Sequence, residues 1–249
     1  MKISVLGIVF AFAIVGLIPA IAQEPVTGNA KVSPTIKASS SAGSAETENL
    51  GWKRLKEHEG IIGYYRPNPR CRIDESKAIG VIEAPVAVVE AVLRDVPGCK
   101  DFMFWFKENL VIEIPEVKNT ADEYVTYTLM AMPFPVQDRD TVARLNWTVD
   151  AATGTVYCTG QTQKTDYRPH PKALRIPFVE ATYALKPVGP DRTEVTYQAM
   201  SDPGGYLPAF VINLLSRDMC LKTIAGIRKK VKLEKYRHAA AVVTATPKK

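Results

Sequence analysis

The chain has 249 residues and a small excess of basic side chains, with 32 Lys and Arg against 26 Asp and Glu and a formal net charge of +6. No dense Lys/Arg patch is interleaved with aromatic residues, so nucleic acid is not expected as a partner. A mild positive charge suits approach to an anionic membrane surface, although it is more often simply a property of soluble proteins. The four cysteines are widely spaced with no CxxC pair, which gives no support to a metal site.

The first 22 residues have the pattern of a secretory signal peptide. Lys2 precedes an apolar run over residues 3–18, and Ala20 and Ala22 are the small residues that a signal peptidase accepts on the N-terminal side of its cleavage site. We therefore expect cleavage after Ala22 and an exported protein, periplasmic or secreted. An uncleaved anchor is the alternative, because the apolar run approaches the roughly 20 residues that span a bilayer.

The rest of the chain divides into a linker, a domain and a tail. Residues 23–49 contain no aromatic residue and no leucine, and their Ser/Ala/Gly-rich centre predicts a flexible linker. Residues 233–249 lose the apolar period and are expected to form a disordered tail. Residues 50–232 are long enough for one domain with a substantial core. Export makes disulfides chemically possible, but a domain of this size does not require one, and buried free thiols behave as small hydrophobes.

The N-terminal part of this domain is predicted to contain a helix, two strands and a second helix. Residues 52–60 are expected to form a short helix that ends at a glycine, and the alternation in residues 61–65 predicts a strand. A second strand is expected over residues 71–82. Pro85 suits the first turn of a helix, and the spacing of the apolar residues predicts an amphipathic helix over residues 86–94.

A hydrophobic period of two follows, and it predicts six strands separated by turn signals. The strands are expected at residues 109–115, 123–132, 141–149, 154–161, 176–185 and 193–200. Six successive strands favour an antiparallel meander, and two further strands make a sheet large enough to curl strongly. The period changes again after residue 205, and residues 206–231 are predicted to form a long helix with one apolar face. We therefore predict an α+β domain in which a curved antiparallel sheet is closed by this C-terminal helix.

Several strings in this order resemble the START domains, the lipid-transfer domains related to steroidogenic acute regulatory protein. They are Trp52 with Glu59-Gly60-Ile61, Met132-Pro133-Phe134-Pro135 leading into Asp138-Arg139-Asp140, Thr193-Glu194-Val195-Thr196-Tyr197, and Asp202-Pro203-Gly204-Gly205-Tyr206-Leu207-Pro208 with Asn213. The resemblance covers residues 50–232. It implies a helix-grip fold with an internal hydrophobic cavity, one bound lipid, sterol or hopanoid-like molecule, and no enzymatic cofactor.

One departure from the best-known sterol-binding members bears on the ligand. Their pocket carries a buried acid and arginine pair, and an ungapped alignment from Arg139 places Thr126 and Leu145 at those two positions. The cavity is then expected to be more apolar than theirs. Arg144 should point to the other face of its strand, because successive side chains alternate.

Alternation and the helix face give the candidate ligand-binding residues, of which about half are expected to be ordinary core. They are Thr126, Thr128 and Met130 on one strand, Leu145 and Trp147 on the next, and Phe210, Val211, Leu214 and Leu221 on the final helix. Asp218 lies near the same helix face and is expected either at its edge or as a polar anchor for a ligand hydroxyl.

A stiff apolar loop is the other candidate element. Pro133, Phe134 and Pro135 are expected either to form a lid that touches a membrane or to be a simple rigid turn. Arg139, between two aspartates, is expected to hold this loop by a charge-assisted hydrogen bond.

No catalytic or metal-binding motif stands out, and the three histidines have no partner at ligand spacing. We therefore expect no catalytic residue, no metal and no cofactor, and predict a monomeric carrier that makes transient contact with membranes. The alternatives from other classes are a polyketide cyclase or aromatase with the same type of fold, which export disfavours, and a sensor or adaptor controlled by a bound lipid.

Overall fold

The structure is a computed structural model that describes residues 51–68, 73–103, 105–132, 134, 136–207 and 209–238, without the side chains of residues 209–211, 214 and 215. The expected signal peptide (residues 1–22) and linker (residues 23–49) lie outside the described residues, as do Cys71 and residues 239–249 of the expected tail. Within the described part of the chain, none of the helices is long and apolar enough to cross a membrane.

One sheet forms most of the domain, with neighbouring strands in the order β1-β2-β3-β10-β9-β7-β6-β5-β4. Its strands are β1 (Lys53–His58), β2 (Ile61–Arg66), β3 (Glu75–Ile82), β4 (Phe106–Ile112), β5 (Glu123–Met130), β6 (Arg139–Val149), β7 (Val156–Thr162), β9 (Phe178–Gly189) and β10 (Arg192–Asp202), and the two-residue β8 (Leu174–Arg175). All neighbours on this path pair antiparallel, and β8 alone pairs parallel, with β6. The predicted meander is confirmed, and the sheet has two edges, β1 and β4, so it is not a closed barrel.

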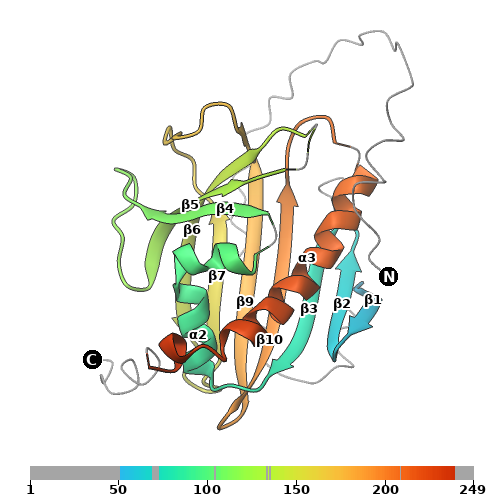
Figure 1. Ribbon diagram of the computed structural model, residues 1–249, viewed down its shortest axis with the longest axis vertical. Helices are drawn as coiled ribbons and strands as arrows, with labels where there is room; N and C mark the ends of the chain where they lie inside the picture. Colours follow the sequence, from blue (N-terminus) through green and yellow to red (C-terminus); the bar gives the residue numbers. More distant parts are fainter. Residues whose placement is uncertain are drawn as a thin grey trace. The chain divides into compact units, whose positions relative to one another are not determined.

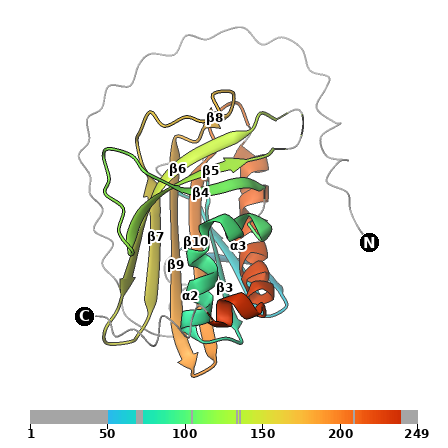
Figure 2. The same ribbon diagram turned by 60° about the vertical axis from the view of Figure 1, so that its left-hand side comes forward.

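The helices lie on one face of this curved sheet (Figures 1 and 2). They are α2 (Val86–Arg94), the short 3-10 helix η3 (Val96–Asp101) and the C-terminal α3 (Ala209–Lys230). α3 runs diagonally across β2, β3 and β10, and α2 packs on β9 and β10 (Figure 1). The predicted α+β fold, in which the final helix closes an antiparallel sheet, is therefore confirmed.

α2 has the bounds that the sequence predicted. Val88, Val89, Val92 and Leu93 are buried and form its apolar stripe, and Pro85 precedes the first turn. Asp95 follows the helix, and its carboxylate accepts a hydrogen bond from the Gly98 backbone N–H at 3.1 Å, which starts η3. The local sequence thus fixes both ends of the helix.

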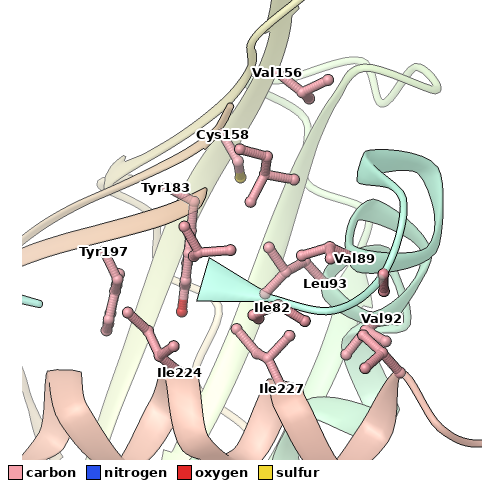
Figure 3. Close-up of a cluster of buried hydrophobic side chains, with 14 of the residues drawn as sticks. Ile82, Val89, Val92, Leu93, Val156, Cys158, Tyr183, Tyr197, Ile224 and Ile227 are labelled. Atoms are coloured by element: carbon pink, nitrogen blue, oxygen red, sulfur yellow. The ribbon is translucent and has the colours of Figure 1, made fainter. Parts of the chain in front are cut away.

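The largest core cluster lies where α2, α3 and the sheet meet (Figure 3). Ile224 and Ile227 point from α3 toward this junction, and both are fully buried. On the sheet, the rings of Tyr183 and Tyr197 stack with centroids 4.2 Å apart and an interplanar angle of 6°. Burial of such side chains stabilises the fold by roughly 1.5–3 kcal/mol each.

Two glycines allow α3 to approach its neighbours closely. A Cβ added at Gly63 of β2 would lie 3.1 Å from Leu221 Cδ1, and one added at Gly226 would lie 2.6 Å from the Cβ of Phe102, just after η3. The second distance is shorter than two carbon atoms can approach without a shift of backbone. α3 is therefore in backbone-level contact with the residues that follow η3.

The predicted helix at residues 52–60 is wrong, since residues 53–58 form the edge strand β1. Five of its six residues are exposed, so the segment lacks the alternation of apolar and polar residues that identifies a strand. Charged side chains are common on edge strands because they prevent pairing with other chains. The turn to β2 passes through Glu59 at φ 52° and Gly60 at φ 68°, which are the positive φ values of a tight two-residue hairpin. The glycine that suggested a helix end is a hairpin turn residue.

The ordered domain continues past the boundary expected at residue 232. Residues 234–238 are helical, and Tyr236 is 3 % exposed, with its hydroxyl donating to Asp95 at 2.9 Å. Lys235 Nζ donates to the same carboxylate at 2.8 Å. The first residues of the expected tail therefore pack against the region between α2 and η3.

Candidate functional site

A cavity of about 150 Å³ lies between the concave face of the sheet and the α2–η3 segment. We call it the deep cavity, and it is lined by Leu93, Val96, Cys99, Met103, Phe106, Asn109, Thr126, Thr128, Thr141, Ala143, Leu145, Trp147, Cys158, Gly160, Val179, Ala181, Tyr183 and Tyr197. None of these residues is Asp, Glu, Lys, Arg or His. The lining is therefore apolar with a few neutral hydrogen-bonding groups, which is the usual composition of a site for a hydrophobic ligand.

The polar groups of the deep cavity mostly satisfy one another. Thr128 Oγ1 donates to Asn109 Oδ1 at 2.8 Å, and Asn109 Nδ2 donates to the Val96 carbonyl at 2.8 Å. Thr126 Oγ1 donates to the Ala143 carbonyl at 3.3 Å. Thr141 Oγ1 is buried without a hydrogen-bond partner, and a buried polar group in that state costs free energy until it is satisfied.

The titratable groups of the deep cavity are neutral near pH 7. Burial raises the pKa of the Cys99 and Cys158 thiols to about 12. Burial likewise raises the pKa of Tyr183 and Tyr197 above the usual range for a phenol. The Tyr183 hydroxyl lies 3.8 Å from Met103 Sδ. The cavity thus offers hydroxyls and thiols as weak hydrogen-bonding groups and no general acid or base poised near neutrality.

A second pocket, of about 90 Å³, lies at the end of the sheet where the β5–β6 and β10–α3 loops meet. We call it the mouth pocket, and it is lined by Trp105, Met130, Met132, Arg139, Ile176, Ser201, Pro203, Leu207, Ile212, Ser216 and Met219. The two loops carry the two most exposed large hydrophobic side chains among the described residues, Phe134 at 92 % and Tyr206 at 106 %. Each of the two loops that border this pocket therefore exposes an aromatic side chain.

Arg139 holds the two loops of the mouth pocket together. Its Nε donates to the Pro203 carbonyl at 3.5 Å, and its Nη1 donates to the Gln137 carbonyl. The side chain is 4 % exposed, and this burial lowers the pKa of the guanidinium although Asp138 acts in the opposite direction. Asp138 itself accepts a hydrogen bond from the Met132 backbone N–H at 3.0 Å. The loop-holding role expected from the sequence is confirmed, with carbonyl groups as the acceptors.

Half of the predicted ligand-binding residues lie in these two pockets. Thr126, Thr128, Leu145 and Trp147 line the deep cavity, and Met130 lines the mouth pocket. Thr126 and Leu145 thus occupy the cavity face where the sequence comparison placed them. Arg144, one residue away on β6, points outward and pairs with Glu123, as alternation predicts.

The remaining predictions lie elsewhere or outside the described residues. Asp218 pairs with Lys56 at 2.5 Å, and Leu221 packs on Gly63, and both face a surface groove of about 510 Å³ between β1 and α3. Asp218 is therefore at the edge of the helix face, which was one of its two expected places. The side chains of Phe210, Val211 and Leu214, and residues Pro133 and Pro135, are outside the described part of the chain.

The helix residues that face the mouth pocket were missed by the sequence reasoning. Ile212, Ser216 and Met219 line it, at spacings of four and three residues that keep them on one side of α3. The next residue of this stripe, Thr223, is fully buried, with its Oγ1 3.9 Å from Met103 Sδ. Two of the four residues are polar, so the stripe does not stand out in a search for the most apolar helix face.

Comparisons with known proteins agree with this architecture. The sequence profile of a family described as START domain matches residues 38–236. An uncharacterized protein from Pseudomonas aeruginosa is 33 % identical over 189 residues, which cover 75 % of this chain and 89 % of that protein. A STAR-related lipid transfer protein fragment from Xanthomonas axonopodis has a similar structure, with a TM-score of 0.66, 24 % identity, and 74 % of this chain and 99 % of that chain covered. Human STARD10 has a TM-score of 0.66 at 19 % identity, with 81 % and 85 % covered.

Proposed function

Because the chain belongs to the START-domain family, we propose that it binds one hydrophobic small molecule, such as a lipid, sterol or hopanoid-like compound, in the deep cavity and carries it between membranes. The observation that carries this proposal is the absence of any Asp, Glu, Lys, Arg or His among the residues that line the cavity. Each ligand CH₂ group that enters such a cavity contributes about 0.8 kcal/mol. A ligand whose apolar part fills the cavity can still carry a polar head group, provided that this group stays outside the neutral lining.

The same site favours a carrier over an enzyme of this fold. A cyclase requires an acid or base whose proton moves near neutral pH, and burial raises the pKa of the cavity thiols to about 12. The cavity hydroxyls of Thr126 and Thr128 are already engaged by neighbouring groups. We therefore propose that the protein binds its ligand, shields it from water and releases it without changing it chemically.

The mouth pocket is the proposed route for the ligand. Phe134 and Tyr206 are almost fully exposed on the two loops that border it, and apolar side chains in that position can insert into a membrane surface. Met130 on β5 lines this pocket, and Thr128 and Thr126 of the same strand face line the deep cavity. A ligand that enters between the loops would therefore reach the deep cavity along one face of β5.

We also propose that the protein acts after export, as its N-terminal signal sequence suggests. N-terminal sequencing of the protein recovered from the periplasm or medium of its host should begin at Gln23. A chain that keeps Met1 and stays with the membrane fraction would favour the uncleaved anchor.

Native mass spectrometry of the full chain purified from its own host tests the binding proposal. The expected result is a protein ion with one hydrophobic molecule bound, which organic extraction releases and small-molecule mass spectrometry identifies. The proposal is wrong if the protein is free of ligand and also takes up no lipid from vesicles made from the host's total lipid extract.

A further inference from the structure

Arg139 in the mouth pocket is a buried charge without a carboxylate partner among the described residues. Its recorded hydrogen bonds go to two backbone carbonyls, those of Gln137 and Pro203. The next residue on β6 shows the contrast, because Asp140 is fully buried and pairs with Arg175 through two bonds of 2.8 and 3.0 Å. Two adjacent residues of one strand are thus both buried, and among the described residues only Asp140 forms a salt bridge, while Asp138 acts on Arg139 without direct contact.

Two other partly buried arginines of the domain pair with carboxylates, whereas the recorded bonds of the partly buried Arg228 go to the carbonyls of Val81 and Glu59. Arg217 pairs with Asp74 at 2.6 Å, and Arg94 pairs with Glu90 at 2.8 Å, each with a side chain 27 % exposed. Arg139 is more buried than either. A buried charge without a salt-bridge partner destabilises the fold relative to a paired one, so a negatively charged ligand group beside Arg139 would be favourable.

The surroundings of Arg139 fit a ligand group better than a purely structural role. A guanidinium has five N–H donors, and two of them have the carbonyl acceptors described above. The bond to Pro203 is 3.5 Å long, at the limit of a hydrogen bond, and a charged acceptor would replace it readily. Ser201 lines the same pocket, and its hydroxyl can donate to an oxygen atom there, whereas the Ser216 hydroxyl already donates to the Asn213 carbonyl at 3.3 Å.

We propose that Arg139 anchors the oxyanion head group of an amphiphilic ligand, a carboxylate or a phosphate, whose hydrocarbon chain lies in the deep cavity, which widens beyond its about 150 Å³ to hold the chain. The planar fork of a guanidinium matches two oxygens of either group. Met130 marks the mouth pocket on β5, and Thr128 and Thr126 follow on the same face at intervals of about 6.8 Å, so the chain would run along this strand. The inference rests on the proposed function, since the hydrocarbon chain needs the deep cavity.

Isothermal titration of the full chain with matched C18 ligands tests the proposal without any variant. Oleate, oleyl alcohol and oleoyl lysophosphatidate share one hydrocarbon chain and differ in the head group. We expect at least one of the two anionic ligands to bind at least tenfold more tightly than the alcohol. The tighter anion identifies the head group as carboxylate or phosphate.

Arg139→Gln tests the residue. This variant should remove the preference for the anion, measured as the ratio of the anion affinity to the oleyl alcohol affinity of the same protein, whatever the change in overall affinity. Arg144→Gln, on the same strand but on its outer face, is the matched control and should keep the wild-type preference. If Arg139→Gln fails to fold, Arg139→Lys keeps the charge and should reduce the preference by removing the two-point contact.

The outcomes separate the two proposals. If wild type binds oleate, oleoyl lysophosphatidate and oleyl alcohol equally, the head-group inference is overturned, and Arg139 only holds the two loops together. The carrier proposal stands in that case. If none of the three binds, and no lipid copurifies, both fail. A thermal shift with inorganic phosphate alone, with no preference among the C18 ligands, would assign the pocket to a free anion and overturn the head-group assignment.

Discussion

The two halves of α3 are held to the sheet in different ways. In the C-terminal half, Ile224 and Ile227 are fully buried, and Gly226 allows backbone-level contact with Phe102. In the N-terminal half, Ile212 and Met219 face the mouth pocket. The C-terminal half of α3 therefore packs on the core, and the N-terminal half covers the mouth pocket.

The N-terminal half is held mainly by polar contacts, whereas the C-terminal half adds close packing to the hydrogen bonds of Arg228 and the ion pair of Lys230 with Asp101. Asn213 Oδ1 accepts a hydrogen bond from the Asp74 backbone N–H at 3.0 Å, and Arg217 pairs with the Asp74 carboxylate at 2.6 Å. The Arg217 guanidinium also lies over the Tyr65 ring, 3.8 Å from its centroid. Polar contacts can exchange with water one at a time, whereas close packing cannot, so we expect the N-terminal half to open while the C-terminal half stays in place.

The largest expected effect is the difference in unfolding free energy lost by two Ile→Ala variants, one in each half of α3. Ile224→Ala removes a fully buried side chain from the core and should lower the free energy of unfolding by about 2–5 kcal/mol. Ile212→Ala enlarges a pocket that already exists and should cost at most about half as much. Urea unfolding measures both, and equal losses would show that the two halves are packed alike.

Asp74→Ala should loosen the N-terminal half alone. The change removes the acceptor of Arg217 and should cost about 1.5–3 kcal/mol of local stability, because hydrogen bonds to charged groups fall in that range. Hydrogen exchange followed by mass spectrometry should show faster exchange in peptides covering residues 209–219 and unchanged exchange in residues 220–230. Faster exchange along the entire helix would mean that α3 moves as one unit.

Gly226→Ala should destabilise the C-terminal half, although alanine is the better helix former. The new Cβ would lie 2.6 Å from the Cβ of Phe102, and overpacking of this kind costs about 1–3 kcal/mol, against a gain of about 1 kcal/mol in helix propensity. In a Phe102→Gly background the opposing Cβ is absent, and Gly226→Ala should then be neutral or stabilising. A double-mutant cycle by thermal unfolding measures this coupling.

Phe134→Asp should weaken membrane contact with little effect on stability. The side chain is 92 % exposed, so the free energy of unfolding should change by less than about 0.5 kcal/mol. Co-sedimentation with anionic vesicles should fall by roughly tenfold if the ring inserts, since burial of a phenylalanine contributes about 1.5–3 kcal/mol. Val188→Asp, at another exposed position on β9, is the control and should leave co-sedimentation unchanged.

The sequence predicted the elements whose local signals and tertiary roles agree. Proline and a valine stripe defined α2, the period of two located the six strands of the meander, and alternation placed Thr126 and Leu145 inside and Arg144 outside. The resemblance to START domains, drawn from short strings, is confirmed by the family match over residues 38–236.

The features that the sequence did not reveal depend on contacts between distant residues. β1 is an edge strand whose exposed, charged residues show no alternation, so its hairpin turn was mistaken for a helix end. The mouth-facing stripe of α3 includes Ser216 and Thr223, which a hydrophobic criterion passes over. Within the described part of the chain Arg139 is buried without a carboxylate in contact, and it bonds instead to carbonyls up to 64 positions away. No local pattern contains that information.

Uptake of lipid by a pair of β6 variants tests the central claim most directly. Ala143 lines the deep cavity, and Arg144 is its outward-facing neighbour. Wild type, Ala143→Trp and Arg144→Trp are incubated with vesicles made from the host's total lipid extract, reisolated and compared by native mass spectrometry. We predict one bound lipid in wild type and Arg144→Trp, and none in a folded Ala143→Trp. Equal uptake by all three would contradict a ligand site in the deep cavity.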